Sequence, residues 1–283
     1  MAVAIVTDTC HYLPRDLIEA QGIREVSLYL HWDGETQRES DITNYDAYYE
    51  RLRTAPELPS TSQPSIGDFL ATYEPLLRAG DDVVSIHLAG GMSGTVHAAE
   101  QAREQLGKLA GRVHVVDSES ACGGEGLVVL AAAAAARAGA DAPGVVGRAH
   151  HARAHLRLWF AIDTLDYLRR GGRIGGAQAW LGSALQIKPI LTVESVITPV
   201  ERVRTSRRAF ERLVELLRTR ARDGADAWVI QHIQAYREAE ELARLGQEMF
   251  KREPLVVSQV GPVIGAHVGP GLLGACGIPA SLI

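Results

Sequence analysis

Short apolar segments alternate with amphipathic ones along the first half of the chain. We expect strands at Ala2–Val6, Glu25–Trp32, Val83–Leu88 and Val113–Val116. We expect helices at Pro14–Gln21, Tyr45–Arg53, Ser65–Leu77, Thr95–Leu109 and Gly124–Ala138. Strands that alternate with helices are typical of a parallel sheet covered on both faces. The first half therefore predicts an N-terminal domain with a mainly parallel sheet and helices on both of its faces.

The second half has a different order of elements. The expected helices are Val145–Ala154, Leu165–Arg169, Phe210–Arg222 and Ala235–Arg252. The expected strands are Leu156–Ile162, two within Leu185–Val203 with a turn at Glu194-Ser195, Ala227–Ile233, and Leu255–Val260 before a glycine-rich tail. A hairpin together with β-α-β elements predicts a mixed sheet. With a break at Ala142-Pro143-Gly144, we predict an N-terminal α/β domain at 1–142 and a C-terminal mixed α/β domain at 143–283.

Composition narrows the class of protein. The 283 residues are 46% hydrophobic and 22% charged, with a formal net charge of −5. These fractions are ordinary for a globular protein and exclude disorder, collagen and a disulfide scaffold. Mild acidity argues against nucleic-acid binding, which needs a clustered basic face. The most apolar run, Leu127–Ala136, is about half of the ~20 residues that a membrane span needs, so we expect no stable membrane insertion.

Three cysteines, Cys10, Cys122 and Cys276, lie far apart, and no disulfide scheme pairs all of them. Reduced thiols and a cytoplasmic protein are the simplest interpretation. The sequence contains no pair of cysteines with the spacing of a zinc ribbon. His151 and His155 are four residues apart on a predicted helix but lack the glutamate of a helical zinc motif. We therefore expect no metal.

Two hydroxyl-rich segments stand just before predicted helices. In Pro59–Ser65, Ser65 and Asp68 have the spacing of a capping box, whereas Thr61 and Ser62 have no capping role. Hydroxyls and free backbone N–H groups at such a junction suit an anion, although an ordinary polar loop has the same composition.

The second segment, Leu88–Thr95, follows a predicted strand and contains Ser93. Ligands of open α/β sheets bind at the carboxyl ends of strands, so Ser93 is a candidate for ligand contact as well as for a helix N-cap. Thr95 stands where a nucleophile elbow has its second glycine, and no lysine follows the glycines as in a P-loop.

A glycine-rich run from Gly261 to Gly274 contains one histidine, His267. Gly269, Gly271 and Gly274 have the spacing of a dinucleotide fingerprint, but too few residues follow them for a βαβ unit. A lone histidine is commonly structural. Its glycine neighbours would let a ligand or another segment approach closely, so a functional role is equally open.

Two basic segments are also candidates. Arg204 lies where a strand runs into a helix, and it is either part of a solvated face or a partner for a carboxylate. Arg170 and Arg173 belong to a glycine-flanked basic run, 169–176. That run suits either the C-terminal end of a helix or an exposed docking site for an acidic partner.

Taken in order, these segments resemble those of one family. They are Thr7-Asp8, Thr61-Ser62-Gln63-Pro64, Ser93-Gly94-Thr95, Asp117-Ser118, Gly171-Gly172-Arg173-Ile174, Lys188-Pro189-Ile190, Arg204-Thr205 and the run from Gly261 to Gly271. The ordered set, from Val3 to about the C-terminus, resembles the DegV family. That family includes the fatty-acid-binding (B) subunit of bacterial fatty acid kinase.

The resemblance implies a two-domain α/β protein with a long-chain fatty acid buried between the domains. It implies that the carboxylate is held by Thr61 or Ser62, by Ser93 and Gly94, and by Arg204 and His267. It also implies that this chain is not an enzyme and carries no cofactor beyond its lipid. A separate kinase subunit would phosphorylate the bound fatty acid to an acyl phosphate, for phospholipid synthesis. Arg170 and Arg173 are then candidates for docking that kinase.

Two other functions remain open at this point. A serine hydrolase would use Ser93 and His267, although the nucleophile elbow is not matched. A regulatory protein that binds a phosphorylated metabolite is the third class. The length and unsaturation of the acyl chain are not determined by the sequence.

Overall fold

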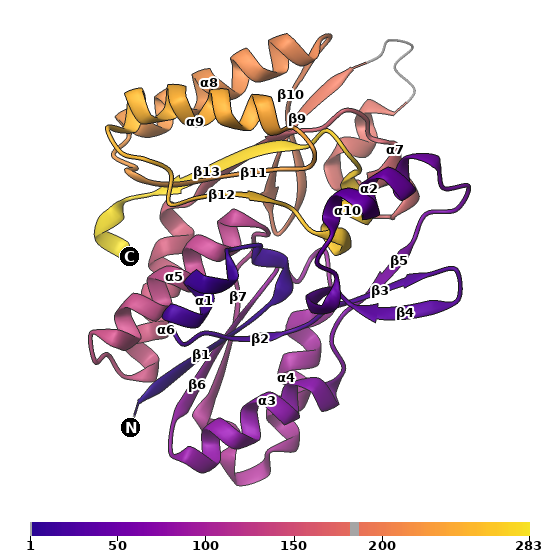
Figure 1. The fold of residues 1–283 in the computed structure, drawn as a ribbon. Helices are drawn as coiled ribbons and strands as arrows, with labels where there is room; N and C mark the ends of the chain where they lie inside the picture. The colour runs from indigo at the N-terminus through magenta and orange to yellow at the C-terminus, as the bar shows by residue number, and fades with distance from the viewer. Residues whose placement is uncertain (1, 182–186) are drawn as a thin grey trace.

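The computed structural model describes residues 2–181 and 187–283 of the chain. Two sheets lie one above the other, with a third, smaller sheet to one side (Figure 1). The lower sheet belongs to the first part of the chain and the upper sheet to the second part. The expected α/β class, with a parallel sheet followed by a mixed sheet, is confirmed.

The lower sheet is parallel and has the strand order β2-β1-β6-β7. Its strands are β1 (Val3–Asp8), β2 (Arg24–Val26), β6 (Asp82–His87) and β7 (Val113–Asp117). Helices α3 (Ile66–Ala79) and α4 (Thr95–Gln105) cover one face, where they meet Val6, Val83 and Val113. Neighbouring residues in the same strands, such as Ile5 and Val84, point to the opposite face.

That opposite face is covered by three helices. They are α1 (Arg15–Ala20), α5 (Gly123–Arg137) and α6 (Ala142–His155). Helix α5 contains the most apolar run of the sequence, Leu127–Ala136, and it is buried along nearly its whole length. The predicted capping box is confirmed, because Ser65 and Asp68 form it at the start of α3.

The small sheet was not expected as a separate unit. It has the order β4-β3-β5, from β3 (Tyr29–Trp32), β4 (Glu35–Arg38) and β5 (Ser60–Ser62). The single strand predicted over Glu25–Trp32 is therefore two strands in two sheets. The hydroxyl-rich segment, expected as a loop, is an edge strand paired with β3, and Thr61 lies opposite Leu30. Helix α2 (Tyr45–Thr54) lies between β4 and β5 in the chain.

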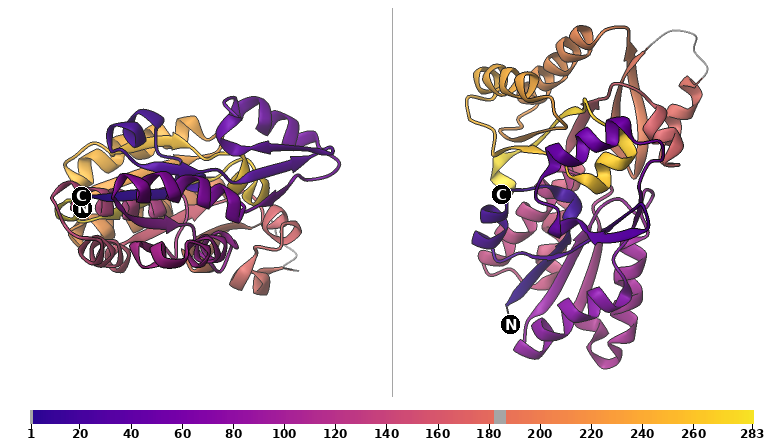
Figure 2. Two further views of the ribbon diagram at one scale, coloured as in Figure 1. Left: turned by 90° about the horizontal axis from the view of Figure 1, so that it is seen from below. Right: turned by 45° about the vertical axis from the view of Figure 1, so that its right-hand side comes forward.

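The upper sheet has six strands in the order β10-β9-β8-β13-β11-β12. They are β8 (Arg157–Ala161), β9 (Lys188–Glu194), β10 (Val196–Val203), β11 (Ala227–His232), β12 (Val256–Gln259) and β13 (Leu273–Ile278). Only β11 and β12 pair in parallel in this sheet. Helices α8 (Ser206–Arg222) and α9 (Tyr236–Phe250) cover the outer face (Figures 1 and 2). The β9–β10 hairpin is confirmed, and the beginning of its predicted range, at Leu185, lies outside the described residues.

The glycine-rich segment that follows Val260, predicted to be a tail, is part of the folded core. It forms the short helix α10 (Pro262–Val268) and then β13, which lies in the middle of the upper sheet between β8 and β11. The prediction that Leu255–Val260 is the last strand is therefore wrong. Strand β13 needs a small residue at Gly274 because the neighbouring strand β8 is close. A Cβ on Gly274 would lie 2.9 Å from Cβ of Phe160.

The remaining helical segments are short. They are α7 (Asp166–Arg170) and the 3-10 turns η1 (Thr9–His11), η2 (Glu39–Asp41), η3 (Gly107–Arg112), η4 (Gly175–Trp180) and η5 (Ala280–Leu282).

The predicted domain boundary at 142/143 falls in the first turn of α6, which packs against β6 and β7. We therefore propose that the change from the first domain to the second is at Leu156, just before β8. Within the described ranges, no helix is long and apolar enough to cross a membrane.

Two glycines within helices, Gly246 and Gly147, differ in how closely other atoms pack against them. A Cβ on Gly246 in α9 would lie 2.2 Å from Cη2 of Trp228, whereas a Cβ on Gly147 in α6 would meet no atom within 4 Å. We expect Gly246→Ala to destabilise the protein by about 1–3 kcal/mol through overpacking. Gly147→Ala should stabilise it by about 0.5–1 kcal/mol, because alanine is the better helix former. Urea denaturation of both variants checks this pair, and equal shifts would contradict the packing described here.

Candidate functional site

One cavity lies between the two main sheets. The space between its lining atoms is about 930 Å³, including the part that opens to solvent. Most of its wall is apolar and comes from the inner face of the upper sheet, from Leu88 and from α10. The polar or charged side chains that line it are Thr61, Ser62, Gln63, Ser93, Arg173, Gln231 and His267. At β13 the cavity is lined by Leu272, Gly274, Ala275 and Cys276.

The structure brings His267 to the hydroxyl-rich strand β5. Nε2 of His267 and Oγ1 of Thr61 are 2.8 Å apart, across 206 residues of sequence. Nδ1 of His267 is buried and has no hydrogen-bond partner among the described residues. When Nε2–H donates to Thr61 Oγ1, the hydroxyl proton of Thr61 is free to donate to a ligand in the cavity. Ser62 instead bonds through Oγ to Nε2 of His31, at 2.8 Å.

Ser93 lies on the loop between β6 and α4. Its Oγ is 2.9 Å from Oγ1 of Thr95 and accepts a long hydrogen bond of 3.4 Å from the backbone N–H of Thr95. The predicted N-cap role of Ser93 is wrong, because Gly94 occupies that position and α4 has no side-chain cap. When the Thr95 hydroxyl donates in the first of these contacts, the hydroxyl proton of Ser93 is available to an acceptor in the cavity.

Gly94 does not line the main cavity, but it lets Gln63 cover this corner of the site. A Cβ on Gly94 would lie 2.9 Å from Nε2 of Gln63. Gly94, Ser93 and Arg173 also line a shallow groove directly outside the cavity. Gly94 therefore serves the site through its small size and its backbone.

Arg173 stands at the mouth of the cavity. Its guanidinium donates to the carbonyl of Met92 at 3.3 Å and to that of Gly171 at 2.8 Å. The side chain is exposed and also lines the cavity. Arg173 therefore supplies the positive charge at this end, and it belongs to the run that the sequence assigned to partner docking.

Burial, and to a smaller extent the charge of Arg173, lower the pKa of His267 to about 4. His267 is therefore neutral at neutral pH. The close packing of Gly171 explains the burial, since a Cβ there would lie 2.3 Å from Nδ1 of His267. A neutral imidazole beside two hydroxyls and an arginine forms a site for one acceptor group with a negative charge.

The structure does not bring Arg204 to this site. Arg204 is exposed after the end of β10 and does not line the cavity. The start of β10 is close to the site, because a Cβ on Gly91 would meet the carbonyl of Ser195 at 2.5 Å. Strand β10 then runs 8 residues away from that point, about 3.3 Å per residue. Arg170 is exposed as well, 4.0 Å from Asp166.

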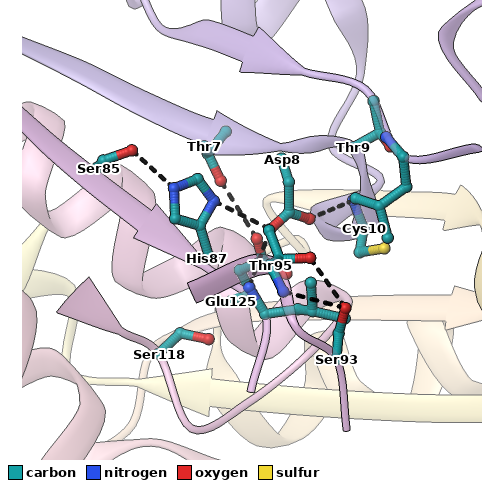
Figure 3. Close-up of polar contacts among 12 residues, drawn as sticks. Thr7, Asp8, Thr9, Cys10, Ser85, His87, Ser93, Thr95, Ser118 and Glu125 are labelled. Atoms are coloured by element: carbon teal, nitrogen blue, oxygen red, sulfur yellow. Dashed lines mark hydrogen bonds and ion pairs between the residues drawn. The ribbon is translucent and has the colours of Figure 1, made fainter. Parts of the chain in front are cut away.

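A buried polar network supports the loop that carries Ser93 (Figure 3). Oδ2 of Asp8 accepts from the backbone N–H of Leu88 at 3.0 Å and bonds Nδ1 of His87 at 3.1 Å. Nε2 of His87 bonds Oγ of Ser85 at 2.6 Å, and Ser85 accepts from Tyr73 at 2.7 Å. All of these side chains are fully buried. They fix the carboxyl end of β6, where the Ser93 loop begins.

The hydrolase hypothesis finds no support in this geometry. Ser93 and His267 both line the cavity, but Ser93 is hydrogen-bonded to Thr95 and His267 to Thr61. The nearest charge that acts on His267 is the cation Arg173, whereas a catalytic histidine needs an acidic partner. The site can hold an anionic head group and does not have the arrangement of an acyl-transfer centre.

Sequence reasoning missed Gln231, a polar residue of the cavity wall. Gln231 follows the apolar residues Ala227–Ile230 near the end of β11 and is buried. A polar residue within a buried strand is the signal that was available. Its carboxamide accepts from the backbone N–H of Gly123 and donates to the carbonyls of His11, at 3.0 Å, and Tyr12, at 3.2 Å.

The fold and the site define a class: two α/β sheets that enclose a mainly apolar cavity with hydroxyls, a histidine and an arginine in its wall. Residues 2–280 match a family model described as "Uncharacterised protein, DegV family". The chain is 38% identical to Protein DegV of Bacillus subtilis over 281 residues, 98% of this chain and 99% of that protein. The chain belongs to the DegV family.

Solved structures of relatives have the same fold. A DegV family protein of Thermus thermophilus, described for its fatty acid binding, superimposes with a TM-score of 0.88 at 33% identity, over 99% of this chain and 100% of that one. DegV of Bacillus subtilis, described as a fatty acid binding protein, gives a TM-score of 0.86 at 35% identity, over 98% and 99% of the two chains.

The electrostatics of the site lead to a measurable titration. We expect His267 to titrate near pH 4, and Arg173→Gln to raise its pKa while leaving it below the ordinary value of about 6.5, because burial is the larger cause. Arg170→Gln is the matched control and should leave His267 unchanged. Histidine NMR titration of the three proteins measures this, and a His267 pKa near 6.5 in the unsubstituted protein would contradict the burial described here.

Proposed function

We propose that this protein binds one long-chain fatty acid, with the carboxylate at Thr61, Ser93 and His267 and the acyl chain along β13. The observation that carries the proposal is the pairing of a mainly apolar cavity with the two hydroxyl groups of Thr61 and Ser93 in its wall. The fatty-acid-binding relatives support it independently. The bound lipid is the ligand, and the chain acts as a carrier rather than as an enzyme.

The acyl chain provides most of the affinity. Burying about 14 methylenes at ~0.8 kcal/mol each contributes about 11 kcal/mol before the costs of association. The carboxylate must keep its hydrogen bonds when it leaves water, because a buried charge without partners is strongly unfavourable. Thr61 and Ser93 replace two of its water molecules, and Arg173 at the mouth offsets its charge.

We propose Thr61 rather than Ser62 as the contact from β5. The Thr61 hydroxyl is paired with His267, which belongs to the cavity wall, whereas Ser62 is tied to His31 on the neighbouring strand β3. Arg173 takes the role that the sequence gave to Arg204. An arginine at the mouth holds the carboxylate near the surface, where an external active site could reach it.

We further propose that a separate fatty acid kinase subunit phosphorylates the bound fatty acid to an acyl phosphate, in the cytoplasm and for phospholipid synthesis. The support is the position of the carboxylate end beside an open groove that Ser93, His97 and Arg173 line. Arg170 is exposed on α7, close in sequence to that mouth, and we propose that Arg170 and Arg173 contact the kinase.

The first test separates the head group from the chain. We expect Thr61→Val and Ser93→Ala each to weaken binding of a long-chain fatty acid about tenfold to hundredfold, the loss of one hydrogen bond to a charged group. Binding of the fatty alcohol of equal length should change much less. Fluorescent-ligand displacement on delipidated protein measures both.

Ser62→Ala is the matched control for this experiment. It removes a hydroxyl from the same strand, and we expect a change below about threefold. A larger loss for Ser62→Ala than for Thr61→Val would move the contact to Ser62. Delipidated protein that shows no saturable fatty-acid binding would overturn the carrier proposal.

The second test concerns the partner. With a purified fatty acid kinase subunit and ATP, we expect Arg170→Ala to raise the apparent KM for this protein and to leave fatty-acid affinity unchanged. The effect should shrink with added salt, because exposed charges are screened. Arg207→Ala, a 90% exposed side chain on α8, is the control. Loss of lipid binding in Arg170→Ala, with kinase affinity intact, would exclude docking through this residue.

A further inference from the structure

Helix α10, which carries His267, begins without a cap from its own segment. Its N-cap residue is Gly261, which has no side chain, and Pro262 at the first position has no N–H. The next two N–H groups are satisfied from the other half of the chain. Val263 donates to Oε1 of Glu39 at 2.8 Å, and Ile264 donates to the hydroxyl of Tyr12 at 3.1 Å.

Glu39 is itself held in place by the N-terminal half. Its Oε1 also accepts from the Tyr12 hydroxyl at 2.8 Å, and its Oε2 accepts from Thr9 at 2.6 Å. Its backbone N–H donates to the carbonyl of Leu28 at 2.9 Å. The side chain is buried, with 1% of its surface exposed. One carboxyl group therefore links η1, η2 and the start of α10.

The fit at this junction leaves little freedom. A Cβ on Gly261 would lie 2.5 Å from Cε1 of Tyr12 and 3.0 Å from Oε1 of Glu39. Further along, a Cβ on Gly265 would lie 2.2 Å from the hydroxyl of Tyr49. Helix α10 lies against α2 in Figure 1, and contacts between the two are present. The helix cannot turn or slide without breaking these contacts.

The residue of α10 that Glu39 binds, Val263, lies on the helix face that lines the cavity. Val263 and His267 are four residues apart, so they lie on the same face of α10, and both line the cavity. A shift at Val263 is therefore passed to the imidazole within one helical turn. Since His267 is only 2.8 Å from Thr61, a small displacement breaks that hydrogen bond.

We propose that Glu39 is the positioning residue of the carboxylate site: by capping α10 from the opposite half of the chain, it sets the place of His267 against Thr61. Glu39 does not line the cavity and acts only through α10. The proposal rests on the proposed function for its consequence in lipid binding. Its structural part, the position of His267, is independent of any ligand.

The protonation of Glu39 makes the stability of the protein depend on pH. Burial raises its pKa to about 7, against the hydrogen bonds from Thr9, Val263 and Tyr12, which lower it. The folded pKa is above the ordinary value, so the stabilisation is present at low pH and is lost as the pH rises through about 7. The titratable groups that interact with Glu39 electrostatically are Asp8, Cys10, Tyr12, Tyr45, Tyr48, Tyr49, Cys122 and Glu125.

The test compares Glu39→Gln with Glu39→Ala in the full chain without lipid. The amide oxygen of glutamine still accepts from Val263 and Tyr12, so we expect Glu39→Gln to leave the His267 NMR signals in place. It should flatten the fall in melting temperature between about pH 4.5 and pH 7, the interval between the ordinary and the raised pKa of Glu39. Glu39→Ala should shift the His267 signals and raise the His267 pKa. Tyr12→Phe is a milder change that removes the hydroxyl bonded to Ile264 and Glu39, and it should move the His267 signals in the same direction. This variant provides the test if Glu39→Ala does not fold.

Lipid binding is the second readout. We expect Glu39→Ala to bind a long-chain fatty acid about tenfold more weakly than the unsubstituted protein and Glu39→Gln to bind within about threefold of it. Leu213→Ala, on the buried face of α8, controls for general destabilisation and should leave both His267 and lipid affinity unchanged. Unshifted His267 signals in a folded Glu39→Ala protein would overturn the positioning role. Absence of lipid binding in the unsubstituted protein would instead overturn only the proposed function.

Discussion

The carboxamide of Gln231 is the buried contact that joins the two halves of this molecule beside the cavity. From β11 in the upper sheet it accepts from Gly123, at the start of α5, and donates to the carbonyls of His11 and Tyr12 in the lower half. A buried amide with all of these partners is stabilising, and one without them would be costly. The two halves are thereby held in one register, which leaves the cavity between them.

The polar part of that cavity is assembled from four separate segments of the chain, which contribute Thr61, Ser93, Arg173 and His267. Thr61 is hydrogen-bonded to a neutral histidine, and Ser93 to Thr95. Hydroxyls held in this way, with a cation at the mouth, are the groups that the proposed carboxylate contact needs.

The buried network below the site shows why geometry alone does not define an enzyme. Asp8, His87 and Ser85 are connected in the order of a catalytic triad, with contacts of 3.1 and 2.6 Å. The serine, however, accepts from Tyr73 and is fully buried, so no substrate reaches it. The same atoms that would activate a nucleophile at a surface here fix the end of β6 and the loop that follows.

The sequence by itself determined the α/β class, most helices and strands, and the family, because apolar periodicity, caps and glycine turns are local signals. It also proposed Thr61 or Ser62, Ser93 and His267 as site residues, and all four line the cavity. Only the tertiary structure decided that the hydroxyl-rich loop is a strand, that the glycine-rich tail is a central strand, and that Arg173 rather than Arg204 is at the cavity. These depend on pairings between residues far apart in the chain, such as Thr61 with Leu30 and Ala275 with Trp159, and strand order across a sheet leaves no periodic trace in the sequence.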